Sequence, residues 1–280
     1  MTDIRRVRRG EDGYPEVLGS IADPPEALWV RGAIPGGVGV AIVGTRRATR
    51  YGLGLARELG AAVASRGWTV VSGLARGIDG AAHRGCVEAK GVGVAVLGSG
   101  VDVWYPKEHE ELGESLIDRG GAVISEYPPG TGPEPWRFPA RNRLISGLSA
   151  VVVVVEAADK GGALITARLA AEQGREVFAV PGDVQRRTSV GTNLLIRDGA
   201  LPILGADDLI EALTLVMGPP PIDAVGGGGT DLALEIPPGG ATIEEVVELN
   251  GGDAVRVLPL LGRLEAEGRL RIEADEVRLN

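Results

Sequence analysis

The sequence predicts an α/β protein: an extended Rossmann-like, doubly wound and mostly parallel sheet, followed by a small C-terminal winged-helix domain. Short β-branched runs alternate with amphipathic stretches from residue 38 onward, which is typical of helices that cover both faces of a parallel sheet. The runs are almost continuously apolar, as strands buried on both faces are. Near the C-terminus, two helical stretches and a period-two run follow a Pro- and Gly-rich segment, and this pattern predicts the second domain.

The spacing of apolar residues predicts each element in turn. Leu55, Leu59 and Val63 share one face of a helix over 51–66, and further helices are expected at 79–89 and 163–173. The most apolar run, AVVVVVEA, is predicted to be a central strand. The strands expected are 38–44, 68–73, 92–98, 121–126, 150–157 and 176–182.

The chain is predicted to have four parts. Residues 1–37 form a short N-terminal extension, punctuated by Pro and Gly, that we expect to lie against the main domain. The Rossmann-like domain spans 38–217. Residues 218–240 contain PPP, GGGG and PPGG, a composition that buries too little apolar surface to order itself and predicts a flexible linker. Residues 241–280 form the winged-helix-like domain.

Composition excludes several classes of protein. The longest apolar run, 150–155, is far shorter than the roughly 20 residues that cross a bilayer, and no apolar signal core follows the basic N-terminus. The single cysteine, Cys86, excludes an internal disulfide, and two histidines leave little material for a zinc site. We expect a cytoplasmic protein with no membrane partner, no metal and no cofactor.

The net charge of −9 is unevenly distributed. Residues 203–280 hold 5 basic and 15 acidic side chains, whereas the other 202 residues hold 24 basic and 23 acidic ones. Clustered arginines in that near-neutral part can form a local positive patch once the chain is folded, so the overall charge neither supports nor excludes a nucleic-acid partner. The clusters are Arg46, Arg47 and Arg50; Arg137, Arg141 and Arg143; and Arg186 and Arg187.

Ligands of open α/β sheets bind at the loops that leave the carboxyl ends of the strands, and the first such loop is GTRRATRYG. Gly44 permits a tight turn, and the start of the following helix offers free N–H groups beside Arg46. This combination suits a phosphate group. The loop has neither the GxGxxG pattern of dinucleotide sites nor the Walker A pattern. An ordinary turn with solvated arginines is the alternative.

The second loop, SGLARGIDGAAHRG, contains Ser72, Gly73 and Gly77, which permit close approach of a ligand. Asp79 and His83 lie four residues apart on one helix face. No serine or cysteine nucleophile has an evident place beside them. We therefore interpret Asp79 as a helix N-cap and His83 as a surface histidine rather than as catalytic groups.

The third loop segment, FPARNRLISGLS at 138–149, combines Phe138 with Arg141, Asn142 and Arg143. Aromatic rings stack on unpaired bases and arginines neutralise phosphates, which is what a single strand of nucleic acid requires. The alternative places Phe138 in the core and pairs Arg141 with an acid.

The fourth loop contains Lys160, Gly161 and Gly162 at the start of a helix, a second potential phosphate cradle. Farther along the chain, Asn193 lies near a helix start and Arg197 lies within that helix. Several loops at one edge of the sheet thus combine Gly with Arg or Lys. Their convergence is more informative than any single loop.

Taken in order, five segments resemble the signature of the DprA/Smf family of DNA-processing proteins. The resemblance covers about residues 14–203, and the leader YPEVLGSIADPPEALWVRG is similar to the segment that precedes the domain in that family. The five segments are AIVGTRRATRYG, VSGLARGIDGAAHRG, FPARNRLISGLS, GGALITARLAAEQGREVFAVPG and GTNLLIRDGA.

The resemblance implies a homodimeric protein without catalytic activity. Such a protein holds single-stranded DNA in a basic pocket, protects it and loads the RecA recombinase onto it during natural transformation and recombination. By position, the resemblance implies that Gly44, Thr45 and Arg46 form the phosphate-facing turn of the pocket and that Lys160 lies opposite them. The other residues it implies at the pocket are Ser72, Gly73, Arg76, Gly77, Phe138, Arg141, Asn142 and Arg143.

The chain departs from the family pattern in three places. Several members of the family have an extra helical N-terminal domain, which the 37 residues before the main domain are too few to form. Gly161 follows the lysine where many relatives carry serine, and the acidic balance of residues 203–280 argues against DNA binding by the C-terminal domain.

A nucleotide-binding or nucleoside-phosphate-cleaving enzyme of the LOG-like type is the alternative function. Those enzymes depend on PGGxGTxxE, and the nearest segments here, PGDVQRRTSVGT and PPGTGPEP, lack that pattern. The missing GxGxxG argues against an oxidoreductase.

Overall fold

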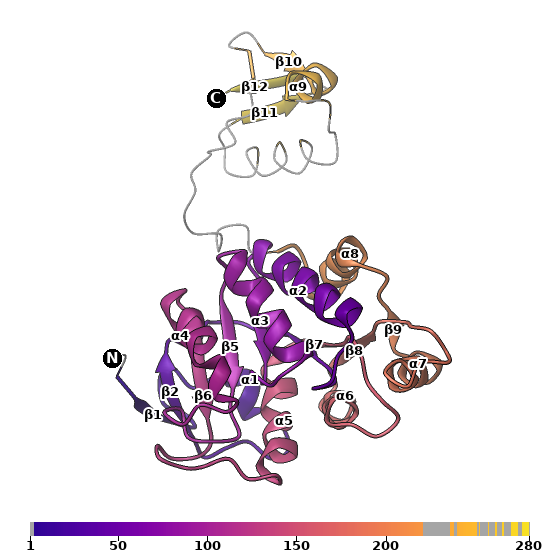
Figure 1. Ribbon diagram of the computed structural model, residues 1–280. Coiled ribbons are helices and arrows are strands. Elements are labelled where there is room, and N and C mark those ends of the chain that lie inside the picture. The colour runs from indigo at the N-terminus through magenta and orange to yellow at the C-terminus, as the bar shows by residue number, and fades with distance from the viewer. Residues whose placement is uncertain are drawn as a thin grey trace. The chain divides into compact units, whose positions relative to one another are not determined.

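The computed structural model describes residues 3–220, 236–237, 240–250, 252, 257, 261, 265, 270–273 and 276–279. The chain divides into two compact units, Met1–Gly226 and Gly227–Asn280 (Figure 1). Most of the linker predicted at 218–240 lies outside the described residues and stays a prediction. Within the described ranges, no helix is long and apolar enough to cross a membrane.

The first unit contains one nine-stranded sheet in the order β1-β2-β6-β5-β4-β3-β7-β8-β9. Neighbouring strands from β6 through β9 pair in parallel, while β1 with β2 and β2 with β6 pair antiparallel. The predicted mostly parallel, Rossmann-like sheet is therefore confirmed. The strands are β1 (Arg5–Arg8), β2 (Ala27–Gly32), β3 (Gly39–Val43), β4 (Val70–Ser72), β5 (Gly93–Val96), β6 (Ala122–Ser125), β7 (Ser149–Val154), β8 (Glu176–Ala179) and β9 (Leu201–Pro202).

All six predicted strands are present, with ends that differ by at most three residues. The most apolar run forms β7, an interior strand between β3 and β8. Every residue of β3 is buried, because side chains on both faces of the strand meet helices. Val40 and Ile42 belong to the core on one face, and Ala41 and Val43 belong to the core on the other.

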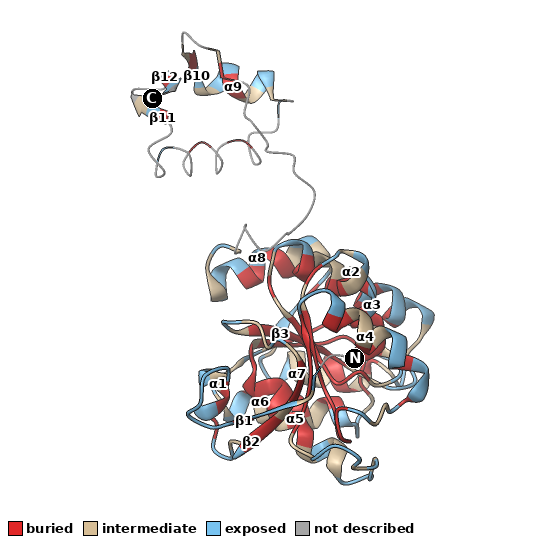
Figure 2. Cartoon of the chain, turned by 90° about the vertical axis from the view of Figure 1, so that its left-hand side faces the viewer, coloured by how far each residue is buried: buried red, intermediate tan, exposed pale blue. Residues whose placement is uncertain are grey.

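Helices cover both faces of this sheet, so that the strands lie buried between them (Figure 2). Helices whose side chains share a core with Ile42 form one layer, and those that share a core with Val43 form the other. The first layer holds α2 (Arg50–Ser65), α3 (Ile78–Glu88), α4 (Glu110–Asp118) and α8 (Ala206–Met217). The second holds α1 (Glu16–Gly19), α5 (Arg137–Gly147), α6 (Gly162–Glu172) and α7 (Val190–Arg197). A 3-10 turn, η1 (Lys107–His109), precedes α4.

The segment 1–37, predicted as an extension against the main domain, contributes two strands to the sheet. Strand β2 pairs with β6, and β1 pairs with β2 at the outer edge. At the end of β2, Gly32 has a φ of 86°, and a Cβ atom there would lie 2.3 Å from the carbonyl oxygen of Gly121. Only glycine fits this close backbone approach.

The loop predicted at 138–149 is instead the helix α5, and that prediction was wrong. Pro139 fits the first turn of a helix, where its missing N–H needs no partner. The helix buries Leu144 and Ile145, but it also buries the polar Arg141 and Asn142. These polar residues interrupt the helical spacing of apolar side chains, so the sequence pattern did not predict the helix.

In the second unit, the described residues include a three-stranded antiparallel sheet and the helix α9. The sheet has the order β10-β12-β11, and the side chain and backbone of Thr242 form a capping box with Glu245 at the start of α9. The second predicted helix of this unit lies mostly outside the described residues, and the winged-helix assignment stays a prediction. The elements are β10 (Ala241–Thr242), α9 (Ile243–Leu249), β11 (Leu270–Glu273) and β12 (Glu276–Leu279).

Candidate nucleic-acid interface

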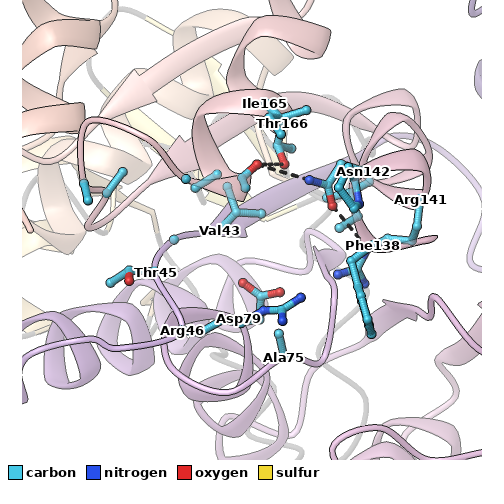
Figure 3. A pocket seen from close by; sticks show the side chains of 18 of the residues that line it. Val43, Thr45, Arg46, Ala75, Asp79, Phe138, Arg141, Asn142, Ile165 and Thr166 are labelled. Carbon is cyan, nitrogen blue, oxygen red and sulfur yellow. Dashed lines mark hydrogen bonds between the residues drawn. The ribbon is translucent and has the colours of Figure 1, made fainter. Parts of the chain in front are cut away.

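The candidate site lies where the order of strands reverses. From β3 the chain runs outward through β4, β5 and β6 and then returns to β7 on the other side of β3. Loops that leave neighbouring strands at such a point diverge and leave a crevice between them. A cavity of about 560 Å³ occupies this place, lined by residues 43–47 after β3 and by residues 157, 158 and 160–163 after β7 (Figure 3).

The first loop is fixed by contacts with the segment after β7. The backbone N–H of Thr45 donates to the carbonyl oxygen of Glu156 at 2.7 Å. Gly44 lies so close to α3 that a Cβ atom would be 2.4 Å from Cγ1 of Ile78. The loop therefore has a defined path, from which Arg46 and Arg47 line the cavity.

The start of α2 is held by the buried carboxylate of Glu156. Its two oxygens accept hydrogen bonds from the backbone N–H of Thr49 at 2.9 Å and from the Thr49 hydroxyl at 2.6 Å. The same hydroxyl accepts from the backbone N–H of Gly52 at 3.0 Å and so caps the helix. Glu156 thus joins the two loops that border the cavity.

One wall of the cavity carries a stacked cation and ring. The guanidinium carbon of Arg46 lies 4.7 Å from the ring centroid of Phe138, and the ring of Tyr105 lies 5.3 Å from that of Phe138. Phe138 is half-buried and lines the cavity rather than the core. Figure 3 shows it beside Arg141 and Asn142 on α5, across from Thr45.

Next to Phe138, the buried guanidinium of Arg141 binds backbone carbonyl groups of two neighbouring segments. Its Nη1 donates to the carbonyl oxygen of Gly73 at 2.9 Å and also to that of Val96. Burial lowers the pKa of Arg141 to about 10, and the charge of Asp79 partly offsets this effect. Arg141 therefore holds the loops after β4 and β5 against α5, in addition to lining the cavity.

Asn142 makes the corresponding connection to α6. Its Oδ1 accepts from Nε of Arg141 at 3.2 Å, and its Nδ2 donates to the carbonyl oxygen of Gly162 at 3.1 Å. Lys160 is exposed on the loop before α6 and lines the same cavity. Seven of the predicted site residues thus line one cavity: Gly44, Thr45, Arg46, Phe138, Arg141, Asn142 and Lys160.

The other five predicted residues lie outside this cavity. The hydroxyl of Ser72 is buried and donates to the carbonyl oxygen of Ile42 at 2.7 Å. Gly73 and Arg76 line a small neighbouring hollow that shares Arg46 and Phe138. Arg76 pairs there with Glu108, with its Nε 2.6 Å from a carboxylate oxygen.

Gly77 and Arg143 have structural roles in this arrangement. Gly77 has a φ of 79°, and a Cβ atom there would lie 2.2 Å from the carbonyl oxygen of Thr45. Arg143 pairs with Asp23 at 2.9 Å and with Glu126 at 2.6 Å, and its side chain is only 14% exposed. Its charge is therefore largely balanced by the two acids, and the assignment of Arg143 to DNA stays a prediction without a place in the cavity.

The interpretation of Asp79 and His83 needs correction. Gly77 is the N-cap of α3, while Asp79 lies in the first turn and accepts from the backbone N–H of Gly73 at 3.2 Å. Burial raises the pKa of Asp79. His83 is fully buried rather than on the surface, and burial lowers its pKa to about 3. Its Nε2 lies 3.3 Å from the carbonyl oxygen of Val94, so its ring is part of the core.

Tyr105 lines the cavity and was not predicted from the sequence, whereas Arg47, which also lines it, belongs to one of the predicted arginine clusters. Tyr105 belongs to the loop after β5, which also leaves a carboxyl end of a parallel strand. The rule that selected the other loops would have found it. In the described part of the chain, no group of three or more His, Cys, Asp or Glu side chains is suited to a metal ion.

The sequence of this chain is similar to those of several known proteins. Residues 5–214 match the family described as DNA recombination-mediator protein A. The chain is 45% identical over 202 residues to Protein Smf of Escherichia coli, a match that covers 71% of this chain and 54% of the relative. It is 44% identical over 203 residues to the DNA processing protein DprA of Bacillus subtilis, covering 71% and 68%. The matched part of this chain thus spans about half the length of the Escherichia coli relative.

Two solved structures have a similar fold. The X-ray structure of DNA processing protein A from Streptococcus pneumoniae superposes with a TM-score of 0.68 at 36% identity, covering 75% of this chain and 74% of that one. The DNA processing protein A of Helicobacter pylori, whose structure describes a single-stranded DNA binding mode, superposes with a TM-score of 0.66 at 29% identity. That match covers 77% of this chain and 99% of that one.

Proposed function

Because the chain belongs to the family of DNA recombination-mediator protein A, we propose that it binds single-stranded DNA in the cavity between β3 and β7. It protects the strand and loads RecA onto it during DNA uptake and recombination. In this function the protein acts in the cytoplasm, as a homodimer and without catalysis. The similarity to a Helicobacter pylori protein with a described single-strand binding mode supports the choice of ligand.

The stacked pair of Arg46 and Phe138 is the observation that carries this proposal. An aromatic ring at a cavity wall offers a stacking face to an unpaired base, and the adjacent guanidinium neutralises a phosphate. Lys160 and Arg47 add positive charge at the same cavity. A duplex keeps its bases paired and stacked, so this arrangement favours a single strand.

Fluorescence anisotropy of a labelled oligo-dT and of a matching duplex, each titrated at low and high salt, tests the proposal. We expect tighter binding of the single strand, weakened by salt because phosphate contacts release counterions. Replacing Phe138 with alanine removes the stacking face, which contributes about 1–3 kcal/mol per base in single-strand sites. Arg46→Ala is expected to weaken binding and to reduce the salt dependence.

Arg66→Ala is the matched control for Arg46→Ala. Arg66 is exposed at the far end of α2, a helix of 16 residues that begins next to the cavity and is about 24 Å long. The control loses the same charge, so equal effects of the two substitutions would contradict a local site. Absence of binding at low salt would refute the single-strand function, and titration with nucleotides would then test the LOG-like alternative.

RecA loading has its own measurement. RecA filaments assemble on single strands, and the chain is expected to accelerate assembly on a strand that it already covers. The Arg46→Ala variant should lose this effect in proportion to its loss of DNA affinity. A wild-type protein that binds DNA but leaves RecA assembly unchanged or slower would contradict the loading function while leaving the binding function intact. Sedimentation measures the expected dimer separately.

A further inference from the structure

We propose that Trp136 is a second stacking platform, which takes the base next to the nucleotide held in the cavity. This inference rests on the proposed single-strand function and extends it beyond the cavity. Trp136 immediately precedes α5. Its chain neighbour Pro135 and the nearby Phe138 both line the cavity, so Trp136 lies between two cavity residues in the chain without lining the cavity itself.

The indole is large, apolar and largely uncovered. Trp136 is 61% exposed, whereas Trp68 is buried and Trp29 and Trp104 are half-buried. A ligand that covers an aromatic ring of this size removes apolar surface from water, which favours binding. Among the described tryptophans, Trp136 is therefore the one best placed to meet a ligand.

Neighbouring side chains hold the indole in position. The guanidinium carbon of Arg137 lies 5.1 Å from the ring centroid of Trp136 and 4.8 Å from that of Tyr127. The Tyr127 and Trp136 rings meet edge to face, with centroids 6.1 Å apart and an interplanar angle of 88°. The Arg137 guanidinium also donates to the carbonyl oxygen of Gly132. A ring oriented before binding loses less conformational freedom when a base stacks on it.

Charge and position select the occupant of this platform. Arg137 lies beside Trp136, and Arg46 lies on the next ring along α5, that of Phe138. Alternating aromatic and cationic groups match the alternating bases and phosphates of a single strand. The two rings are two residues apart at the start of α5 and have different aromatic neighbours, Tyr127 for Trp136 and Tyr105 for Phe138. Because side chains two residues apart on a helix point to different faces, the proposal requires the strand to bend around the start of α5 between the two rings.

Tryptophan emission and anisotropy test the platform together, with the full chain and a labelled oligo-dT. We expect the strand to quench tryptophan emission, and Trp136→Phe to lose most of that quenching while it retains most of the affinity. Trp136→Ala is expected to bind about 5- to 150-fold more weakly, the loss that corresponds to one stacked base. Thermal unfolding checks that the exposed substitution leaves the fold intact.

An abasic oligonucleotide of the same length and charge provides the control. Trp136→Ala should lose affinity for oligo-dT but much less for the abasic strand, because the backbone alone offers nothing to stack on Trp136. Equal losses on both strands, or unchanged quenching in Trp136→Phe, would overturn the platform. A substitution that alters self-association but not DNA affinity would overturn it as well, by assigning the ring to a protein contact.

These outcomes are separable from failure of the proposed function. If the wild-type chain does not bind oligo-dT, both proposals fall. If the wild-type chain binds and Arg46→Ala weakens binding while Trp136→Ala does not, the cavity stands and the platform alone is refuted.

Discussion

The carbonyl oxygen of Gly73 accepts a hydrogen bond from Nη1 of Arg141 at 2.9 Å, and this bond ties the loop after β4 to helix α5. The two residues require each other. A Cβ atom at position 73 would lie 2.3 Å from the same nitrogen, so a larger residue would displace the guanidinium. Arg141 in turn donates to two backbone carbonyl oxygens, and buried carbonyl groups need such hydrogen bonds.

Arg141→Met is expected to lower the free energy of unfolding by about 2–4 kcal/mol, since it leaves the carbonyl oxygens of Gly73 and Val96 without this donor. Urea denaturation measures the change. Arg197→Met, at an exposed arginine of α7, is the control and should change stability by less than about 0.5 kcal/mol. A similar small effect at both positions would mean that water replaces the Arg141 contacts.

Gly77→Ala is expected to destabilise the protein by about 1–3 kcal/mol and to weaken DNA binding, because a methyl group there meets the carbonyl oxygen of Thr45 at a positive φ. Gly54→Ala in α2 provides the contrast. No atom lies within 4 Å of a Cβ at that position, and alanine should stabilise the helix by up to about 1 kcal/mol. Thermal unfolding of the two variants should therefore shift in opposite directions.

Thr49→Ala removes both the helix cap and the hydroxyl that donates to Glu156. We expect a loss of about 1–2 kcal/mol in unfolding free energy, together with weaker binding of oligo-dT as the loop that carries Arg46 loosens. Thr49→Ser keeps the hydroxyl and should restore most of both quantities. If serine fails to restore them, the methyl group rather than the hydroxyl is the stabilising part.

His83 predicts a pH dependence of stability. Its pKa is about 3 in the folded chain against 6.5 for the unperturbed group, because burial disfavours the charged ring. The unfolded chain therefore takes up the proton first. Stability is complete above pH 6.5 and falls as the pH drops toward 3, by up to about 1.4 kcal/mol per pH unit.

Denaturation of wild type and His83→Gln at pH 7 and pH 5 isolates this contribution. We expect the wild type to lose about 2 kcal/mol more between the two pH values than the variant does. Burial lowers the pKa of His109 and raises that of Asp79, but both groups are present in both proteins and largely cancel in the difference. Identical pH profiles would show that His83 is not the group that titrates.

The sequence predicted the strands better than it predicted the environments of polar side chains. Apolar runs such as that of β3 are expected of strands buried on both faces. The rule that ligands of α/β sheets bind at the carboxyl ends of the strands correctly indicated loops that border the cavity. Burial of Arg141 and His83 could not be predicted. The two side chains are buried because they contact backbone carbonyl oxygens that only the folded chain brings close. Arg141 contacts those of Gly73 and Val96, and His83 contacts that of Val94.

The contacts of Arg143 also could not be predicted from the sequence. Its sequence neighbours favoured a DNA contact, but its nearest charges are Asp23 and Glu126, at separations of 120 and 17 residues. Segment 1–37 brings Asp23 to α5. A local pattern can select residues of suitable chemistry, yet only the tertiary arrangement decides whether an acid already balances their charge.

Both ends of the nine-stranded sheet resist continuation by another strand. The outermost strand β1 carries exposed Arg5, Arg6 and Arg8, and at the opposite end β9 is only two residues long and contains Pro202. Like charges and proline are the features that keep sheet edges from joining edge to edge. We therefore expect two copies of this chain to associate through helices and loops. Removal of residues 1–37 is expected to leave the edge of β6 without its partner strand β2 and so to promote aggregation.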